Sequence, residues 1–252
     1  MILAITEIGI IPFFRSPVDG WSVEDLTDPD WWFYTSDNLG PWDWKIDVVR
    51  EGDIAYGKFL SKKAAFATLE WYRHLMNWRR SLAQHTVAGA KTESGRLPEL
   101  LSPVVLDTIR QYGALESSEL RAICGIKKNV MDAVLQYLDM GTWTIIGDFR
   151  RVYRGPNLTY SGWQRSTITT PDALFGTASS CSTRDSGELI TGHRQELSSD
   201  RRTEEPFWAR FIEDNTTDPT ETNCSPEESR QLIIEHLTKL YPGNEARFNK
   251  II

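Results

Sequence analysis

Basic and amide side chains in the middle of the chain have the chemistry for contact with nucleic acid. Cations bind phosphates, whereas amides pair with base edges such as that of adenine. One group lies along a predicted helix at about 128–140: Lys127, Lys128, Asn129 and Gln136. A second group lies in the strand region that follows: Arg150, Arg151, Arg154 and Arg165. Of these residues, we expect Lys127, Lys128, Arg150 and Arg151 to form one patch that contacts phosphates.

A second positive region lies earlier in the chain, although the whole protein has a net charge of −7. Residues 41–96 contain ten lysines and arginines against six aspartates and glutamates. This region could be a track for phosphates or an ordinary solvated face, and both interpretations stay open. Its candidate contacts are Lys58, Lys62, Lys63, Arg73 and Arg80.

Other kinds of site have no signal in the sequence. None of the four histidines or three cysteines stands at the spacing of metal ligands, and no glycine-rich phosphate loop occurs. We therefore expect no metal and no cofactor. No apolar run is long enough to span a bilayer, and an odd number of widely spaced cysteines suits a reducing compartment. The expected location is the cytoplasm, away from membranes.

The elements that must position the first two groups are predicted within 97–175. A first helix starts with Ser102 as its N-cap and Pro103 at its first position. A second runs from an N-cap at Ser117 to a left-handed cap at Gly125. The helix at 128–140 follows, and β-branched or aromatic runs at 142–146 and 160–169 predict a hairpin. Three helices followed by a hairpin indicate a winged helix-turn-helix domain, in which the third helix can enter a major groove.

The region before this domain, 1–96, is predicted to be mixed helix and strand. It begins with an apolar helix at 2–8, followed by an aromatic run at 31–34 that is more typical of a buried plug than of a platform for bases. Alternating residues at 42–48 and runs at 54–60 and 64–67 predict a small antiparallel meander. On the next helix, apolar residues from Leu69 to Leu82 are expected to face inward, and Arg73, Asn77 and Arg80 outward.

The region after the winged helix divides into two parts. Residues 176–206 are rich in Ser, Thr, Gly and charge, which predicts a disordered insertion. Residues 207–252 are predicted to be C-terminal helices, one of which starts with a capping box between Ser225 and Glu228. Its apolar stripe would run from Leu232 to Leu240 and include His236 as a core residue. The predicted fold class is α+β.

Two blocks of sequence carry a resemblance to a known family. The first runs from Tyr56 into KFLSKKAAFATLEWYRHLMNWRR, and the second is the winged helix with FRRVYRGPN and TTPDALFG. Both resemble the AlkZ/YcaQ family of bacterial DNA glycosylases, and more closely its shorter branch of AlkZ-related proteins. The resemblance implies tandem winged helices around a DNA channel, and an activity that unhooks alkylated bases and crosslinks.

The catalytic motif of these glycosylases is replaced in this chain. They carry a Gln-apolar-Gln or Gln-apolar-Asp triplet after an apolar-Gly-apolar-apolar run. Here the run Ile8-Gly9-Ile10-Ile11 is followed by Pro12-Phe13-Phe14, which offers neither a carboxylate nor an amide. Where the family places a histidine in the first block, this chain has Lys62 or Lys63. The triplet at 12–14 is therefore expected to be structural.

Three hypotheses for the function follow. The first is a DNA-binding protein in DNA repair that lacks the family's catalytic triplet. The second is an active DNA glycosylase that uses other residues, such as Asp43 or Glu70, as its acid or base. The third is a winged-helix module that binds a protein partner, because fold does not determine function.

Overall fold

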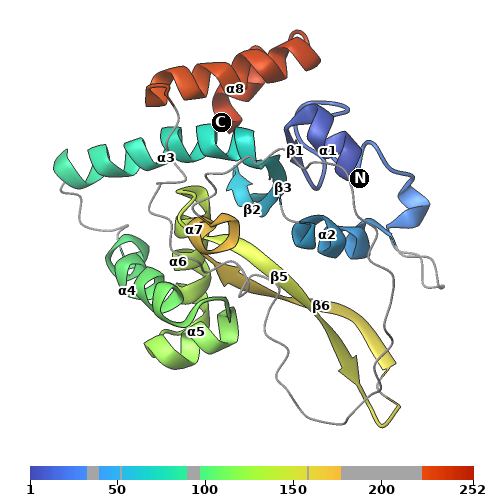
Figure 1. Cartoon of the computed structure of the whole chain (residues 1–252), viewed down its shortest axis with the longest axis vertical. Coiled ribbons are helices and arrows are strands. Elements are labelled where there is room, and N and C mark those ends of the chain that lie inside the picture. Colours follow the sequence, from blue (N-terminus) through green and yellow to red (C-terminus); the bar gives the residue numbers. More distant parts are fainter. Residues whose placement is uncertain (33–39, 52, 90–96, 158, 177–222) are drawn as a thin grey trace, which may run out of the picture.

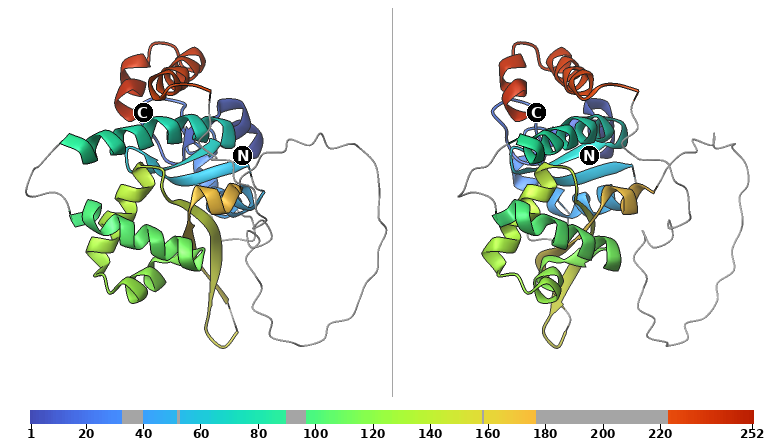
Figure 2. Two further views of the ribbon diagram at one scale, coloured as in Figure 1. Left: turned by 60° about the vertical axis from the view of Figure 1, so that its left-hand side comes forward. Right: turned by 90° about the vertical axis from the view of Figure 1, so that its left-hand side faces the viewer.

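The computed structural model describes residues 1–32, 40–51, 53–89, 97–157, 159–176 and 223–252. Helix α3 (Leu69–Gly89) lies between a small sheet and the C-terminal helices α8 (Pro226–Leu240) and α9 (Glu245–Ile251). Helices and a long hairpin from the region 97–175 lie on the other side of the sheet (Figures 1 and 2). The predicted α+β class is confirmed.

The N-terminal sheet has three antiparallel strands in the order β1-β3-β2. Strands β2 (Ile54–Leu60) and β3 (Lys63–Thr68) confirm the second and third strands of the predicted meander. The third member is β1 (Ile10–Pro12), which follows helix α1 (Ile2–Ile8) and was not predicted as a strand. It is short and ends in proline, which an edge strand can accommodate because one side of it needs no ladder partner.

The strand predicted at 42–48 is wrong, because helix α2 (Pro41–Arg50) occupies this segment. Gly40 is the extended N-cap, and Pro41 fits the first helical position because its missing N–H has no partner there anyway. Lys45, Ile46 and Val49 are buried at helical rather than alternating spacing. The apolar residues at 42, 44, 46 and 48 fit the two-residue period of a strand and, four residues apart, the period of a helix. Tertiary packing decided between strand and helix.

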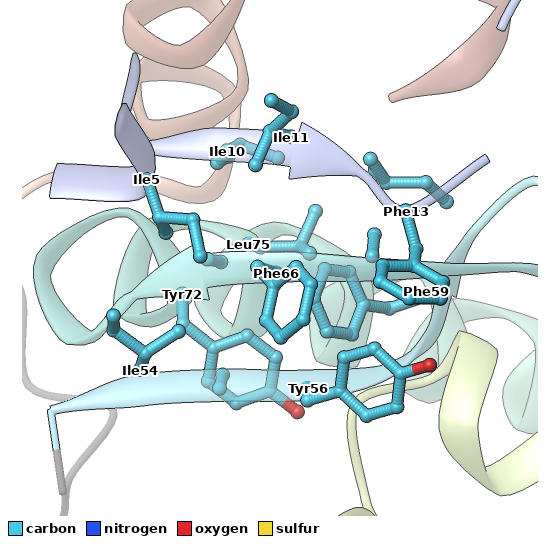
Figure 3. Close-up of a cluster of buried hydrophobic side chains, with 14 of the residues drawn as sticks. Ile5, Ile10, Ile11, Phe13, Ile54, Tyr56, Phe59, Phe66, Tyr72 and Leu75 are labelled. Atoms are coloured by element: carbon cyan, nitrogen blue, oxygen red, sulfur yellow. The ribbon is translucent and has the colours of Figure 1, made fainter. Parts of the chain in front are cut away.

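The main core is one cluster that includes residues of the N-terminal sheet and of α3. Figure 3 shows part of this cluster, including Ile5, Phe13, Phe66 and Tyr72, and all four are fully buried. Burying such large apolar side chains is the dominant favourable contribution to folding. Phe248 of α9 and residues of α8 belong to the same cluster, so the C-terminal helices complete the core of the N-terminal region.

Helix α8 begins as predicted, with Ser225 and Glu228 forming a reciprocal capping box. Its His236 also behaves as predicted: its Nε2 lies 2.9 Å from the carbonyl oxygen of Ile8, and its ring stacks on Trp71 with centroids 4.1 Å apart. Leu232 and Leu240, predicted to face the core, are instead exposed. The buried stripe runs through Ser229, Ile233, Ile234 and Leu237, because it must match the surface of α3.

Two polar residues predicted to face outward from α3 instead form hydrogen bonds with other parts of the fold. Asn77 donates to the carbonyl oxygen of Cys224 and to the hydroxyl of Ser229, at 2.9 and 2.8 Å. Arg80 donates to the carbonyl oxygen of Thr142 at 3.1 Å. Leu82, predicted to face inward, is exposed. A single amphipathic period cannot describe α3, because different elements cover it on two sides.

The region 97–175, named the winged-helix region, has the element order of a winged helix and is compatible with that fold. Helices α4 (Leu97–Tyr112), α5 (Ser117–Cys124) and α6 (Lys128–Met140) precede the hairpin of β5 (Ile145–Arg154) and β6 (Thr159–Thr169), and helix α7 (Pro171–Phe175) follows. A short strand, β4 (Leu115–Glu116), pairs with β6 and completes a second sheet in the order β4-β6-β5. The helices enclose a smaller core with Val105, Ile109 and Leu138.

Three boundaries in this region differ from prediction. Helix α4 already includes Leu97, so Ser102 and Pro103 lie inside it, and the Ser102 hydroxyl donates to the carbonyl oxygen of Glu99. The N-cap of α5 is Glu116 rather than Ser117, because Glu116 forms a capping box with Glu119. Strand β5 begins at 145 rather than 142. The αL cap at Gly125 and the whole of α6 are confirmed.

Several predictions lie outside the described residues. They concern the second half of the aromatic run at 31–34, the insertion at 176–206 except Gly176, and the first part of the helical region at 207–252. The described half of the aromatic run is a 3-10 helix, Pro29–Trp31, followed by Trp32, which is buried as a plug would be. The boundaries proposed between 1–96, 97–175, 176–206 and 207–252 stay predictions.

Candidate nucleic-acid interface and a buried lysine

The start of helix α6 combines backbone and side-chain groups that suit a phosphate. Lys127 is its N-cap residue, adopts an extended conformation and makes no side-chain cap hydrogen bond. Lys127, Lys128 and Asn129 are all exposed. The first backbone N–H groups of any helix lack intrahelical partners, and the helix dipole places partial positive charge there. The first turn of α6 also contains no acidic residue.

The hairpin brings two arginines together. Arg150 of β5 and Arg165 of β6 are directly opposite each other in the register. Their guanidinium groups lie 3.9 and 3.4 Å from the carboxylate of Glu116, and both side chains are at least half exposed. Such partly exposed ion pairs contribute little stability. This Glu116 also caps α5, so one carboxylate ties the hairpin to the start of the second helix.

Arg151 is not on the same side of the hairpin as Arg150. Successive side chains of a strand point to opposite faces, and Arg151 is opposite Gln164 rather than Arg165. The Gln164 amide donates to the carbonyl oxygen of Trp42 at 3.0 Å, so this face of the hairpin lies toward α2. The predicted group of four hairpin arginines is therefore divided between two faces. Arg154 is at the end of β5, and its side chain lies outside the described part of the structure.

A cavity of about 560 Å³ lies between β2 and the winged-helix region. The predicted base-reading residue Gln136 lines it instead of projecting freely from α6. Lys58 of β2 is exposed and lines the same cavity, which has aromatic and acidic walls. The lining includes Tyr56, Lys58, Asp132, Gln136, Asp139 and Phe149.

The carboxyl group of Asp139 is the most perturbed acid at this cavity. Burial raises its pKa from 3.8 to about 6, although the hydrogen bond from Thr144 and the charge and backbone amide of Lys58 act in the opposite direction. The Thr144 hydroxyl donates to its Oδ1 at 2.6 Å. Desolvation disfavours the charged form of a buried acid, so Asp139 can change protonation state close to neutral pH.

The basic residues of the first block are dispersed rather than collected into one track. Lys62 lies in the β2–β3 turn, where its backbone N–H contacts the sulfur of Met140 at the end of α6. Lys63 donates to the carbonyl oxygen of Arg15 at 3.0 Å. Arg73 is half-buried, and the Arg80 guanidinium lies 4.6 Å from the ring centroid of Trp143. The last contact joins α3 to the winged-helix region.

The triplet that replaces the glycosylase motif lies inside the aromatic core. The Phe13 ring is fully buried, and its centroid lies 4.9 Å from those of Phe14 and Trp32. It also contacts Trp42, Tyr56 and Phe66. Aromatic rings in these edge-on and tilted arrangements stabilise one another beyond simple area burial. This position supplies packing, and no group in the triplet can transfer a proton.

A buried amine lies beside this aromatic cluster. The Lys45 Nζ is 3.8 Å from the ring centroid of Trp42, 4.8 Å from that of Phe149 and 5.9 Å from that of Phe13. The residue is 4 % exposed. Burial lowers the pKa of Lys45 from 10.5 to about 8, against the opposing charge of Asp43. A lysine with a depressed pKa has more of its neutral, nucleophilic form at pH 7.

Lys45 was missed because the strand prediction placed it on a polar face. The available signal was its spacing from Pro41 and Val49, which are four residues away on either side and are also buried. The two acids suggested as catalytic residues are differently placed. Asp43 accepts from Gln164 at 3.3 Å. Glu70 is exposed on α3, where its negative charge opposes the lowering of the His74 pKa by burial.

The described residues contain no helix both long and apolar enough to cross a membrane. Over the same ranges, no group of three or more His, Cys, Asp or Glu side chains could hold a metal ion.

Neither the comparison with curated proteins nor the comparison with solved structures found a match. The family model described as "AlkZ related" matches residues 1–212, which is most of the chain. The protein therefore belongs to the AlkZ-related family.

Proposed function

We propose that this protein binds DNA through the exposed start of helix α6 and the arginines of the hairpin, and that it acts in DNA repair without the glycosylase triplet. The observation that carries the proposal is the start of α6, where Lys127 and Lys128 are exposed beside uncapped backbone N–H groups. Membership of the AlkZ-related family supports the same conclusion.

The contrast between α5 and α6 strengthens this argument. Helix α5 has an acidic capping box that satisfies its first N–H groups, and its first turn contains Glu119. Helix α6 has no side-chain cap, and it has a lysine at its N-cap and another at its first position. A phosphate at the start of α6 would accept from backbone N–H groups and neutralise nearby cations, which is how helix N-termini bind anions.

The hairpin adds a second, weaker contribution. Arg150 and Arg165 share the carboxylate of Glu116, so two guanidinium groups are paired with one negative charge. Both arginines are partly exposed, so a phosphate can compete for them at little cost. Arg151 lies on the other face, so we assign it no part in the same contact.

The test measures binding of duplex, forked and single-stranded DNA by fluorescence anisotropy at several salt concentrations. The variant Lys127→Gln/Lys128→Gln should weaken binding to every sequence and lower the log–log salt slope by about 0.9 for each lost phosphate contact. The matched control is Lys239→Gln/Lys250→Gln, which removes the same charge from exposed positions of α8 and α9. Asn129→Ala should change sequence preference more than the salt slope, because amides contact base edges.

Equal losses in the two double variants would show that only total charge matters and would refute a binding face on α6. If the parent protein fails to bind any of the three DNA forms, the proposal is wrong. The hypothesis that the region 97–175 binds a protein partner would then be favoured.

A further inference from the structure

We propose that the cavity between β2 and α6 binds one unpaired nucleobase, with a preference for a base that carries an exocyclic amino group. Such a base can belong to a free nucleoside or to an unpaired position in DNA, and the experiment separates these two sources. For the DNA source, the inference rests on the proposed function. The triplet at 12–14, which replaces the family's catalytic motif, does not line this cavity.

Four polar side chains line the cavity without a partner in the fold. They are Tyr56, Ser117, Gln136 and Ser166. None of these four side chains forms a hydrogen bond or an ion pair with any residue that the structure describes. The Tyr56 side chain is buried, and a buried tyrosine hydroxyl ordinarily has a hydrogen-bond partner. Unpaired polar groups that converge on a cavity can hold a small polar ligand.

Aromatic side chains in the cavity wall suit a flat ring. Tyr56 of β2 and Phe149 of β5 both line the cavity, and their ring centroids are 5.6 Å apart with planes inclined at 62°. Aromatic side chains bind nucleobases by stacking, because every base has a π-face. The cavity volume of about 560 Å³ is within the range of small-molecule sites and is sufficient for a nucleoside.

Helix α6 contributes hydrogen-bonding groups to another part of the wall. Asp132 and Gln136 are four residues apart and therefore share one face of the helix, and both line the cavity. An amide can pair with the amino group and N7 of adenine, and a carboxylate can accept from the amino group of cytosine. Thymine has no amino group to donate. This wall therefore favours a base with an exocyclic amino group over thymine.

The position of β2 explains why the base should be unpaired. Lys58 of β2 lines the same cavity as Gln136, and the backbone N–H of Lys62 lies 3.2 Å from the sulfur of Met140 at the end of α6. Reading paired bases requires the helix itself to enter the major groove. Because β2 lies beside the second half of α6, a duplex cannot enclose this part of the helix. An unpaired base needs only the cavity.

The start of α6 provides a route from the proposed phosphate contacts to the cavity. Lys128 and Asp132 are both exposed, share one face of the helix and are about 6 Å apart along its axis. Asp132, Ala133 and Lys58 are the exposed residues of the lining, so the cavity opens to solvent beside them. A phosphate held at the start of α6 would place the next nucleotide near this opening. The route does not involve the hairpin arginines.

The first measurement uses free nucleosides, which contain no phosphate and so do not test the lysines of α6. Deoxyadenosine should bind the full-length protein at least about fivefold more tightly than thymidine in a saturation-transfer NMR titration. The variant Gln136→Leu removes the amide and should weaken deoxyadenosine binding at least about fivefold. The matched control is Gln111→Leu, because Gln111 is exposed on α4 and does not line the cavity. This control should bind deoxyadenosine as the parent does.

The second measurement tests DNA as the source of the base. Fluorescence anisotropy compares a duplex that contains one unpaired adenine with the same duplex fully paired. If DNA is the source, the unpaired adenine should strengthen binding at least about fivefold in the parent and in Gln111→Leu, and an unpaired thymine should add less. The gain should disappear in Gln136→Leu while the salt slope stays that of the parent, because no phosphate contact is lost.

Two results would overturn the inference. One is a parent protein that binds neither deoxyadenosine nor the unpaired adenine in preference to the paired duplex. The other is base binding that is unchanged in Gln136→Leu or equally tight for thymine. Nucleoside binding without a gain from the unpaired adenine would assign the cavity to a free nucleoside, and a gain without nucleoside binding would assign it to DNA. Absence of all DNA binding, together with deoxyadenosine binding that Gln136→Leu removes, would refute the proposed function alone.

Discussion

The substitution Asp139→Asn should remove a pH-dependent loss of stability. Burial raises the pKa of Asp139 from 3.8 to about 6, so the folded state holds this proton more tightly than the unfolded chain does. Between about pH 4 and 6 the folded protein binds more protons at this site, and its free energy of unfolding therefore falls as pH rises. Above about pH 6 the full cost of the buried carboxylate is present.

The size of this effect follows from the two pKa values. Moving the pKa of one group from 3.8 to about 6 corresponds to about 3 kcal/mol. Asparagine can still accept from the Thr144 hydroxyl through its carbonyl oxygen. It carries no charge, so the cost of burying the carboxylate disappears. The difference in free energy of unfolding, variant minus parent, should therefore increase by about 3 kcal/mol from pH 3.5 to pH 7.5.

The assay is urea unfolding of both proteins across this pH range, followed by tryptophan fluorescence. Asp107→Asn is the control, because this carboxylate is on an exposed side of α4 and its removal deletes no buried charge. The pH trend is the measured quantity, so a constant offset caused by the new amide facing Lys58 does not affect it. A difference that stays flat, or that falls as pH rises, would show that Thr144 and Lys58 outweigh burial and would refute the reasoning.

Two further predictions concern the aromatic core and the segment before the C-terminal helices. Phe13→Ala should lower the free energy of unfolding by about 3–5 kcal/mol, because it empties a fully buried aromatic site. Leu3→Ala on the exposed side of α1 should cost less than about 0.5 kcal/mol in the same urea titration, and equal costs would contradict a structural role for Phe13. Replacing residues 177–205 with a short Gly/Ser linker should leave the melting temperature within a few degrees, since their composition offers little to a core. A large drop in a calorimetric scan would show that this segment contributes to folding.

Local chemistry alone determined a large part of the fold. Helix α6, the αL cap at Gly125, the capping box of Ser225 with Glu228, and the β5–β6 hairpin were all predicted from spacing, caps and turn residues. These signals are reliable because each depends on hydrogen bonds and backbone conformations within a few residues. The exposed lysines at the start of α6 were predicted in the same way.

Tertiary structure decided what local patterns left ambiguous. The segment at 41–50 fits a strand or a helix by period, and packing against β2 and β5 selected the helix that buries Lys45. The helical period of α3 predicts that Arg80 faces solvent. In the structure it contacts the winged-helix region, where its guanidinium donates to the carbonyl oxygen of Thr142. Gln136 is on the outer face of an isolated helix but lines a cavity once β2 is in place. In each case the deciding partner is distant in the sequence, and long-range contacts are what a local pattern cannot contain.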